Sequence, residues 1–217
     1  MIPGLANVLS CPFCGGKKEV MNIVSGNTSG LTVWSDTRRR YPMLPEVSPI
    51  QQCPHCKKYY FTAQAKREYS KDPESGIRSF GKLGELSYLE LKEAKKQMES
   101  LSLTKMQRWI LNHQSFMAYN DTFRRYRETS ADSPSEEDEI FFKQIIEEML
   151  EDINQSANRE LLHAELLRET GRFDEARKIL VGYKNKDYKW IVDAMLRHIE
   201  SKDIFPFLLV ENGSIVK

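Results

Sequence analysis

Two short stretches decide the fold of this chain: Cys11-Pro12-Phe13-Cys14-Gly15 and Cys53-Pro54-His55-Cys56-Lys57. They are two copies of one pattern, and together they hold all four cysteines of the 217-residue sequence. Zinc prefers four soft ligands in a tetrahedron, and two residues between cysteines let one tight turn supply two thiolates. We therefore predict one structural zinc ion bound by Cys11, Cys14, Cys53 and Cys56. His55 stands between two ligands and is expected to face solvent rather than bind metal.

The separation between the two pairs is longer than usual. It is 38 residues, against about 15–20 in common zinc sites of this kind. Doubling the length of a flexible loop costs only about 0.6 kcal/mol, whereas structural zinc contributes about 10–16 kcal/mol in small peptides. The long loop therefore does not count against a metal site.

Other uses of the cysteines fit the sequence less well. A thioredoxin-type redox motif needs one pair followed by a helix, whereas strand and turn residues surround both pairs here. Two disulfides are chemically allowed but disfavoured in a reducing compartment. Four free core thiols would not explain two identically spaced pairs. Iron or an iron–sulfur centre stays open as an alternative to zinc.

The region up to residue 72 is rich in β-branched residues and turn formers. Glu19–Ser25 and Leu31–Ser35 are typical of strands, and the Gly26–Gly30 stretch between them predicts a hairpin with a long loop. Tyr59–Thr62 predicts a third strand. This succession of cysteine turn, hairpin, cysteine turn and strand resembles the zinc-ribbon family over residues 8–65. The resemblance implies a metal site, while the function of zinc ribbons varies from nucleic-acid binding to protein binding.

The pattern changes to helical spacing after a predicted linker at residues 73–84, which is rich in glycine. We predict a helix over 86–100 and a longer one over 104–128, where Thr104 and Gln107 form a capping box. A third helix is predicted from an N-cap at Ser133 to about Ile153. Two helices flanking Gly171, a last helix over 188–200 and a C-terminal hairpin around Asn212-Gly213 complete the prediction.

One helical segment resembles a tetratricopeptide helix pair. It covers residues 158–176, and the matching positions are Ala164, Gly171, Phe173 and Ala176. Tetratricopeptide repeats need about three neighbours for stability, and the flanking helices match the pattern poorly, so a simple helical hairpin is the alternative. As a whole, the chain resembles uncharacterised bacterial proteins that join a zinc ribbon to tetratricopeptide-like helices. That resemblance implies an architecture and no particular activity.

A basic and aromatic stretch is the best ligand-binding candidate outside the cysteines. Trp34 and Tyr41 flank the triplet Arg38, Arg39 and Arg40. Such a set can contact phosphates and stack on bases. We favour a solvated loop whose arginines pair with nearby acids, because one triplet is a small basic area.

Two other groups of residues receive structural interpretations. Arg124, Arg125 and Arg127 are expected to be solvated at a helix C-terminus. The scattered His113, His163 and His198 are expected to be ordinary core or surface residues. These groups therefore predict no second site.

Composition excludes few functions. The net charge is +1, no apolar run approaches the roughly 20 residues of a membrane span, and the first residues lack the features of a secretory signal. We therefore expect a cytoplasmic location and no membrane partner. The sequence also lacks the common motifs of hydrolases, phosphate-binding loops and zinc proteases, so no enzymatic activity is predicted.

These observations predict an α+β protein. A small β-rich zinc-ribbon module at residues 1–72 is followed by the linker at 73–84. An α-helical domain at 85–217, either tetratricopeptide-like or a bundle, completes the chain. The expected function is non-enzymatic, as a protein-interaction or scaffold module with structural zinc and a protein partner. A nucleic-acid-binding protein that uses the ribbon and Arg38–Arg40 is the second hypothesis, and an enzyme with an unrecognised site is the third.

Overall fold

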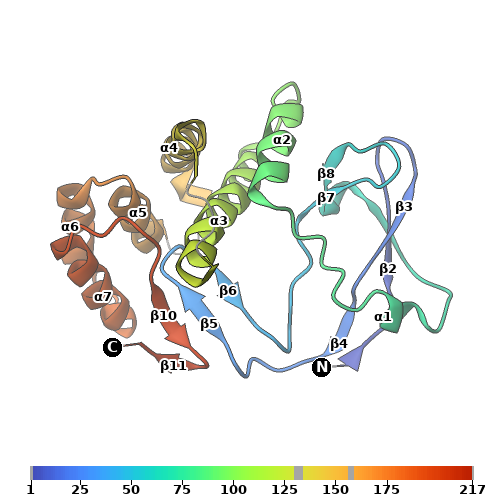
Figure 1. The fold of residues 1–217 in the computed structure, drawn as a ribbon, viewed down its shortest axis with the longest axis horizontal. Coiled ribbons are helices and arrows are strands. Elements are labelled where there is room, and N and C mark those ends of the chain that lie inside the picture. Colours follow the sequence, from blue (N-terminus) through green and yellow to red (C-terminus); the bar gives the residue numbers. More distant parts are fainter. Residues whose placement is uncertain (1, 130–133, 156–158, 217) are drawn as a thin grey trace. The chain divides into compact units, whose positions relative to one another are not determined.

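The computed structural model describes residues 2–129, 134–155 and 159–216. Small antiparallel sheets are followed along the chain by helices, so the predicted α+β class is confirmed (Figure 1). The chain forms two compact units. The first, which we call the cysteine unit, comprises Met1–Gly30 and Tyr41–Gln107. The second, the helical unit, comprises Leu31–Arg40 and Arg108–Lys217.

Short antiparallel strands build most of the cysteine unit. Each cysteine pair lies in the turn between two paired strands, β2 with β3 and β7 with β8. Strand β9 pairs with the other edge of β2, and β1 pairs with β4. The elements of this unit are β1 (Ile2–Pro3), β2 (Asn7–Ser10), β3 (Lys17–Val20), β4 (Ile23–Ser25), β7 (Ile50–Gln52), β8 (Tyr59–Phe61), η1 (Thr62–Gln64), β9 (Lys66–Tyr69), α1 (Ser75–Arg78) and α2 (Tyr88–Met98).

The predicted linker is an integral part of the cysteine unit. Ser75 and Gly76 of α1 are buried. The backbone N–H of Met21 donates to the carbonyl of Lys82 at 3.1 Å, and that of Ser48 donates to Leu83 at 3.0 Å. The stretch 73–84 therefore bonds two segments that are distant in sequence, one at Met21 and one at Ser48. Its glycines make turns within a folded unit rather than a flexible connection.

Helix α2 also belongs to the cysteine unit, whereas the prediction assigned it to the helical domain. The Gln97 side chain accepts a hydrogen bond from the Tyr59 N–H at 3.0 Å and donates to the Tyr59 carbonyl at 3.3 Å. The Gln97 side chain thus makes the hydrogen bonds that a neighbouring strand would make at the free edge of β8. Ser87 and Glu90 form the capping box that starts the helix.

The helical unit contains seven helical segments and one sheet within the described residues. They are β5 (Thr32–Trp34), β6 (Arg39–Arg40), α3 (Lys105–Thr129, of which all but the first turn lies in this unit), α4 (Glu136–Glu151), η2 (Ile153–Gln155), α5 (Arg159–Glu169), α6 (Phe173–Gly182), η3 (Lys186–Tyr188), α7 (Lys189–Glu200), β10 (Leu208–Glu211) and β11 (Ser214–Ile215). The sheet has the order β11-β10-β5-β6.

Strand β5 corrects the predicted hairpin. It pairs with β6 and β10 in the helical unit, while β4 pairs with β1 in the cysteine unit. The long Gly26–Gly30 stretch that suggested a hairpin loop is the connection between the two units. The predicted C-terminal hairpin is confirmed, since β10 and β11 pair across Asn212-Gly213.

Helix caps follow local sequence closely. Thr104 and Gln107 form the predicted capping box before α3, with bonds of 3.2 and 3.0 Å. The N-cap of α4 is Ser135, whose hydroxyl accepts from the Asp138 N–H. The predicted cap, Ser133, lies outside the described residues.

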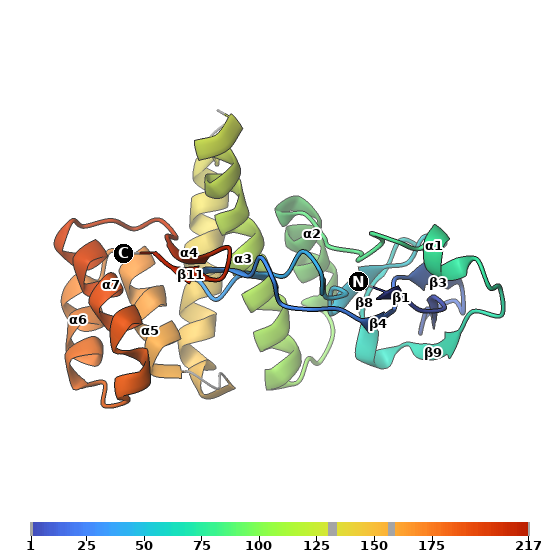
Figure 2. The same cartoon turned by 90° about the horizontal axis from the view of Figure 1, so that it is seen from below.

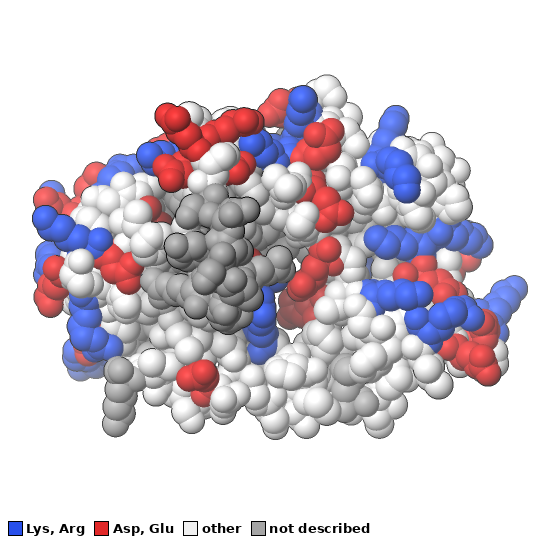
Figure 3. All heavy atoms as spheres, in the orientation of Figure 1, with Lys and Arg blue, Asp and Glu red and all other residues white. Residues whose placement is uncertain are grey.

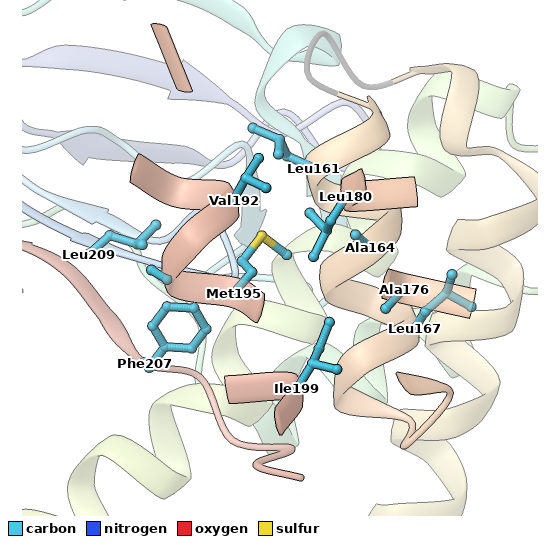
Figure 4. Packing of buried hydrophobic residues seen from close by; sticks show 11 residues of the cluster. Leu161, Ala164, Leu167, Ala176, Leu180, Val192, Met195, Ile199, Phe207 and Leu209 are labelled. Carbon is cyan, nitrogen blue, oxygen red and sulfur yellow. The ribbon is translucent and has the colours of Figure 1, made fainter. Parts of the chain in front are cut away.

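Helices α5, α6 and α7 lie side by side (Figure 2) and pack around one apolar cluster (Figure 4). Ala164 and Ala176 are fully buried where α5 approaches α6, and Gly171 takes a positive φ of 76° in the turn. Phe207 and Leu209 bring the β10 segment into the same cluster (Figure 4). The predicted helical hairpin is therefore present, with small residues at its close contact.

Candidate metal centre

The two cysteine turns have the same backbone hydrogen bonds. In the first, the Gly15 N–H donates to the Cys11 carbonyl at 2.9 Å. In the second, the Lys57 N–H donates to the Cys53 carbonyl at 3.0 Å. Each turn is closed by a further bond, from Cys11 to Gly16 and from Cys53 to Lys58. The repeated sequence pattern therefore folds into two equivalent ligand turns.

The four sulfur atoms lie at distances that suit one tetrahedral ion. All four lie within 4.8 Å of one another. The Sγ atoms of Cys11 and Cys56 are 3.8 Å apart, and those of Cys14 and Cys53 are 3.6 Å apart. A zinc–sulfur bond of about 2.3 Å gives an edge of about 3.8 Å in a tetrahedron. The predicted cysteines therefore form one cluster compatible with a metal ion, and two of them come from each turn.

Electrostatics at the cluster also favour a cation. Burial raises the pKa of Cys53, but N–H donors of Cys56 and His55 and the adjoining thiols outweigh it and lower the pKa to about 6. The Gly16 N–H lowers the pKa of Cys14, but adjoining thiols outweigh it and raise the pKa to about 11. A negative charge on one cysteine sulfur thus raises the pKa of the neighbouring thiols. A bound cation is needed to hold all four as thiolates at neutral pH.

The two turns pack against each other in a reciprocal way. The third residue of the first turn, Phe13, lies under the Lys58 ammonium at 5.1 Å from the ring centroid. The third residue of the second turn, His55, lies against Gly16, where an added Cβ would come within 2.4 Å of the imidazole. His55 is exposed and outside the sulfur cluster, as predicted. Position 16 therefore requires glycine, because His55 of the opposite turn occupies the space that a side chain would need.

The residue after the second cysteine of each turn lies in the left-handed region. Gly15 has φ of 71° and Lys57 has φ of 61°. This conformation costs a residue with a Cβ about 1–2 kcal/mol relative to glycine. We expect Lys57→Gly to raise the free energy of unfolding of the cysteine unit by about 1 kcal/mol and Gly15→Ala to lower it by a similar amount.

Chemical denaturation of the metal-loaded variants, followed by a signal from the cysteine unit, measures both changes. An added Cβ at Gly15 meets no atom within 4 Å, so its effect reports backbone conformation alone. Equal stability of Gly15→Ala and the unmodified protein would contradict this interpretation.

The arginine triplet and its flanking aromatics are divided between the two units. Trp34 and Arg38–Arg40 belong to the helical unit, whereas Tyr41 begins the second part of the cysteine unit. Arg38 and Arg40 pair with Asp121 at 3.1 and 3.3 Å, and Arg39 is exposed. Two of the three arginines therefore pair with an acid, as the solvated-loop interpretation expected.

A buried polar network lies beside this loop and was not predicted. The Asp36 carboxylate is fully buried and accepts hydrogen bonds from Asn120 and Arg124 at 3.1 Å each. Asn120 also donates to Glu169 of α5, at 2.9 Å. Arg124 is only 5% exposed, so its predicted solvation is wrong. The side chains of Arg125 and Arg127 lie outside the described part.

Burial raises the pKa of Glu169 well above its ordinary range, and the neighbouring Glu165 carboxylate adds to this effect. Charged residues in helices normally indicate a solvated face, and nothing in the local sequence marks these as buried. Polar residues at helical spacing on α3, such as Asn112, Asn120 and Arg124, are a signal that could have suggested a polar contact.

His113 and His198 have ordinary hydrogen-bond partners. His113 shares a hydrogen bond with Thr37 at 2.8 Å, and burial together with the Arg38 charge lowers its pKa to about 4. His198 pairs with Asp203 at 2.9 Å and stacks on Phe207. Burial lowers the pKa of His163. Within the residues that the structure describes, the four cysteines form the one group of potential metal ligands.

Comparison with families of known proteins, with curated proteins and with solved structures gives no match to this chain. Among the described helices, none combines the length and apolar character needed to cross a membrane.

Proposed function

We propose that this chain is a non-enzymatic zinc protein that serves as a protein-interaction module. The tetrahedral spacing of the four sulfur atoms supports this proposal most strongly. Four thiolates fill the shell of a zinc ion and leave no position for a catalytic water. The role of the metal is then to hold the two turns together and to stabilise the cysteine unit.

Exposed apolar residues on the cysteine unit support an interaction role. Ile2, Val24 and Ile77 are 61%, 71% and 77% exposed. Strand β1 pairs with β4, which carries Val24. An added Cβ on Gly76 would lie 2.3 Å from the Gly4 carbonyl oxygen, so the residue before Ile77 touches the segment after β1. The three exposed side chains thus belong to adjoining segments of one unit, and an apolar patch formed there would favour a protein partner.

Two measurements test the proposal. Metal analysis of reduced, unchelated protein should give one zinc per chain, with a sulfur-only coordination spectrum. Less than half an equivalent, or a required nitrogen ligand, would contradict the zinc assignment. An iron spectrum would assign the site to the alternative metal.

Affinity capture from a lysate of the source organism, treated with RNase and DNase, tests the interaction role. We expect Val24→Ser with Ile77→Ser to reduce capture of a protein partner at least about fivefold. Val181→Ser with Ile140→Ser is the matched control, because these residues are 73% and 61% exposed but belong to the helical unit. An equal loss in both variants would contradict a specific surface on the cysteine unit.

Nucleic-acid binding is the second hypothesis. Asp121 offsets Arg38 and Arg40 at close range, and acidic and basic side chains are interspersed on the face seen in Figure 3. Phosphate recognition favours a continuous basic surface instead. Arg39 is exposed and could contact a phosphate, so nucleic-acid binding is still worth testing.

Neutralising the triplet distinguishes these hypotheses. Arg38→Gln is expected to lower the free energy of unfolding by about 1–2 kcal/mol, because it leaves the largely buried Asp121 with one partner fewer. Arg39→Gln should change it by less than about 0.5 kcal/mol. Thermal unfolding measures both. We expect no specific nucleic-acid complex, and a micromolar complex at physiological salt that the triple substitution abolishes would favour the second hypothesis.

A further inference from the structure

The chain passes between the two units three times. It leaves the cysteine unit after Gly30, returns at Tyr41 and leaves again after Gln107. The excursion Leu31–Arg40, which we call the inserted hairpin, carries β5 and β6 and lies in sequence between the two cysteine pairs. The predicted ligand turns therefore bracket an element that belongs to the other unit.

The inserted hairpin is a structural part of the helical unit. Strand β5 pairs with β10, and the Ser35 N–H donates to the Phe207 carbonyl at 2.9 Å. The Phe207 N–H donates in return to the Ser35 hydroxyl at 3.0 Å. Asp36 joins the buried network with Arg124. Without this hairpin, β10 would lose one of its two neighbouring strands and Arg124 would lose a buried partner.

The two ends of the inserted hairpin are held close together in the cysteine unit. An added Cβ on Gly26 would lie 2.2 Å from the Met43 carbonyl oxygen, and one on Gly30 would lie 3.4 Å from Pro42. We call residues 26–30 and 41–43 the stalk. Two segments, residues 15–25 and 44–52, connect the stalk to Cys14 and Cys53, and we call them the arms. The sulfur atoms of these two cysteines are 3.6 Å apart.

We propose that zinc at the four cysteines controls the docking of the inserted hairpin in the helical unit. This inference rests on the proposed zinc function. The apolar cluster at the ligands is small: Cys11, Cys53 and Tyr60 are buried, and Cys56 and Ala65 pack against them. A bound metal would therefore be the main link between the two turns. When the metal dissociates, nothing links the two cysteine turns at that end of the arms. Residues 26–30 can then move away from residues 41–43.

The size of the effect follows from loop closure. In the folded cysteine unit the residues from Tyr41 to Gln107 are ordered, so the connection from the hairpin to Arg108 is fixed. Once that unit unfolds, the connection becomes a flexible chain of about 67 residues. Each doubling of a loop lowers the closure probability about threefold. Roughly three doublings, at about threefold each, predict undocking that is roughly 20–30-fold more frequent.

Hydrogen exchange on the full-length protein tests this inference, with zinc content measured in every sample. After chelation we expect exchange that is roughly 20–30-fold faster in peptides covering 31–40 and 207–211. Peptides from α5 (159–169) should change much less, and added zinc should restore the slow rates. Zinc loss with unchanged exchange in 31–40 would overturn the inference and leave the zinc assignment intact. Equal acceleration in α5 would also overturn it, because it would indicate general unfolding.

A stalk variant tests the route separately from the metal. Gly26→Ala forces a side chain against the Met43 carbonyl, whereas Thr28→Ala changes an exposed residue of the same loop. We expect Gly26→Ala to keep one zinc per chain and to speed exchange in 31–40, and Thr28→Ala to leave both unchanged. Unchanged exchange in Gly26→Ala would overturn transmission through the stalk. Protein that contains no metal from the start would instead contradict the proposed function.

Discussion

Replacing Cys53 with serine is expected to abolish stoichiometric zinc binding and to unfold the cysteine unit at 25 °C. Structural zinc contributes about 10–16 kcal/mol in small peptides, a value comparable to the whole stability of a typical domain, about 5–15 kcal/mol. Helices α1 and α2 should melt with the sheets, because Gln97 of α2 bonds the free edge of β8. The helical circular dichroism should therefore fall by roughly a sixth, the share of helical residues in α1 and α2.

His55→Ala is the matched control for this substitution. His55 lies two residues from Cys53 in the same turn, but its exposed ring is not part of the sulfur cluster. The control should keep one zinc per chain and full helicity. A Cys53→Ser protein that retains stoichiometric zinc would contradict the four-thiolate site. Loss of all helical signal would show that the two units unfold as one.

Replacing Arg168 with methionine is expected to lower the free energy of unfolding of the helical unit by about 3–5 kcal/mol. Arg168 and Glu165 are both 0% exposed, and the guanidinium bonds both carboxylate oxygens at 2.8 and 2.7 Å. It also donates to the carbonyls of Asp203 and Phe205, the segment that leads into β10. Removing one partner of a buried pair leaves the other charge uncompensated.

Arg172→Met is the control, because Arg172 and Glu175 form a pair of the same spacing at 2.8 Å that is 37% and 53% exposed. It should cost less than about 1 kcal/mol. Chemical denaturation at neutral pH measures both variants. Equal losses in the two variants would contradict the importance of burial at Arg168.

The effect of Arg168→Met should also depend on pH. Burial raises the pKa of Glu165, but the charge of Arg168 and its hydrogen bonds outweigh burial and lower it below its ordinary 4.5. A lowered folded pKa stabilises the protein above pH 4.5, and this contribution is lost as the pH falls through the lowered value. The difference between variant and unmodified protein should therefore shrink in acid.

Features encoded locally were predictable from the sequence. The two cysteine turns, the Thr104 capping box and the Asn212-Gly213 hairpin each depend on residues within a few positions of one another. The sulfur cluster followed as well, because zinc requires four ligands and the chain has four cysteines. Binary patterns and turn residues act over such short ranges, so they specify the elements well.

Long-range pairings were not predictable in the same way. Nothing near Leu31–Ser35 indicates that its partner is β10 rather than the adjacent strand. Likewise, a charged helical position such as Arg168 or Glu169 has the same local sequence whether it is solvated or buried. The glycines of 73–84 allow both a linker and a set of tight turns, and only the bonds to Met21 and Ser48 decide between them.

The pairing of Trp34 with Leu208 has a consequence for the order of synthesis. The two residues are 174 positions apart, and a ribosome adding about 5–20 residues per second needs about 9–35 s to make that stretch. During this time β5 has an unpaired edge, and such edges are prone to pair with other chains. Both cysteine turns emerge long before β10. Metal binding early in synthesis would therefore hold together the chain segments on either side of β5 before β10 has been made.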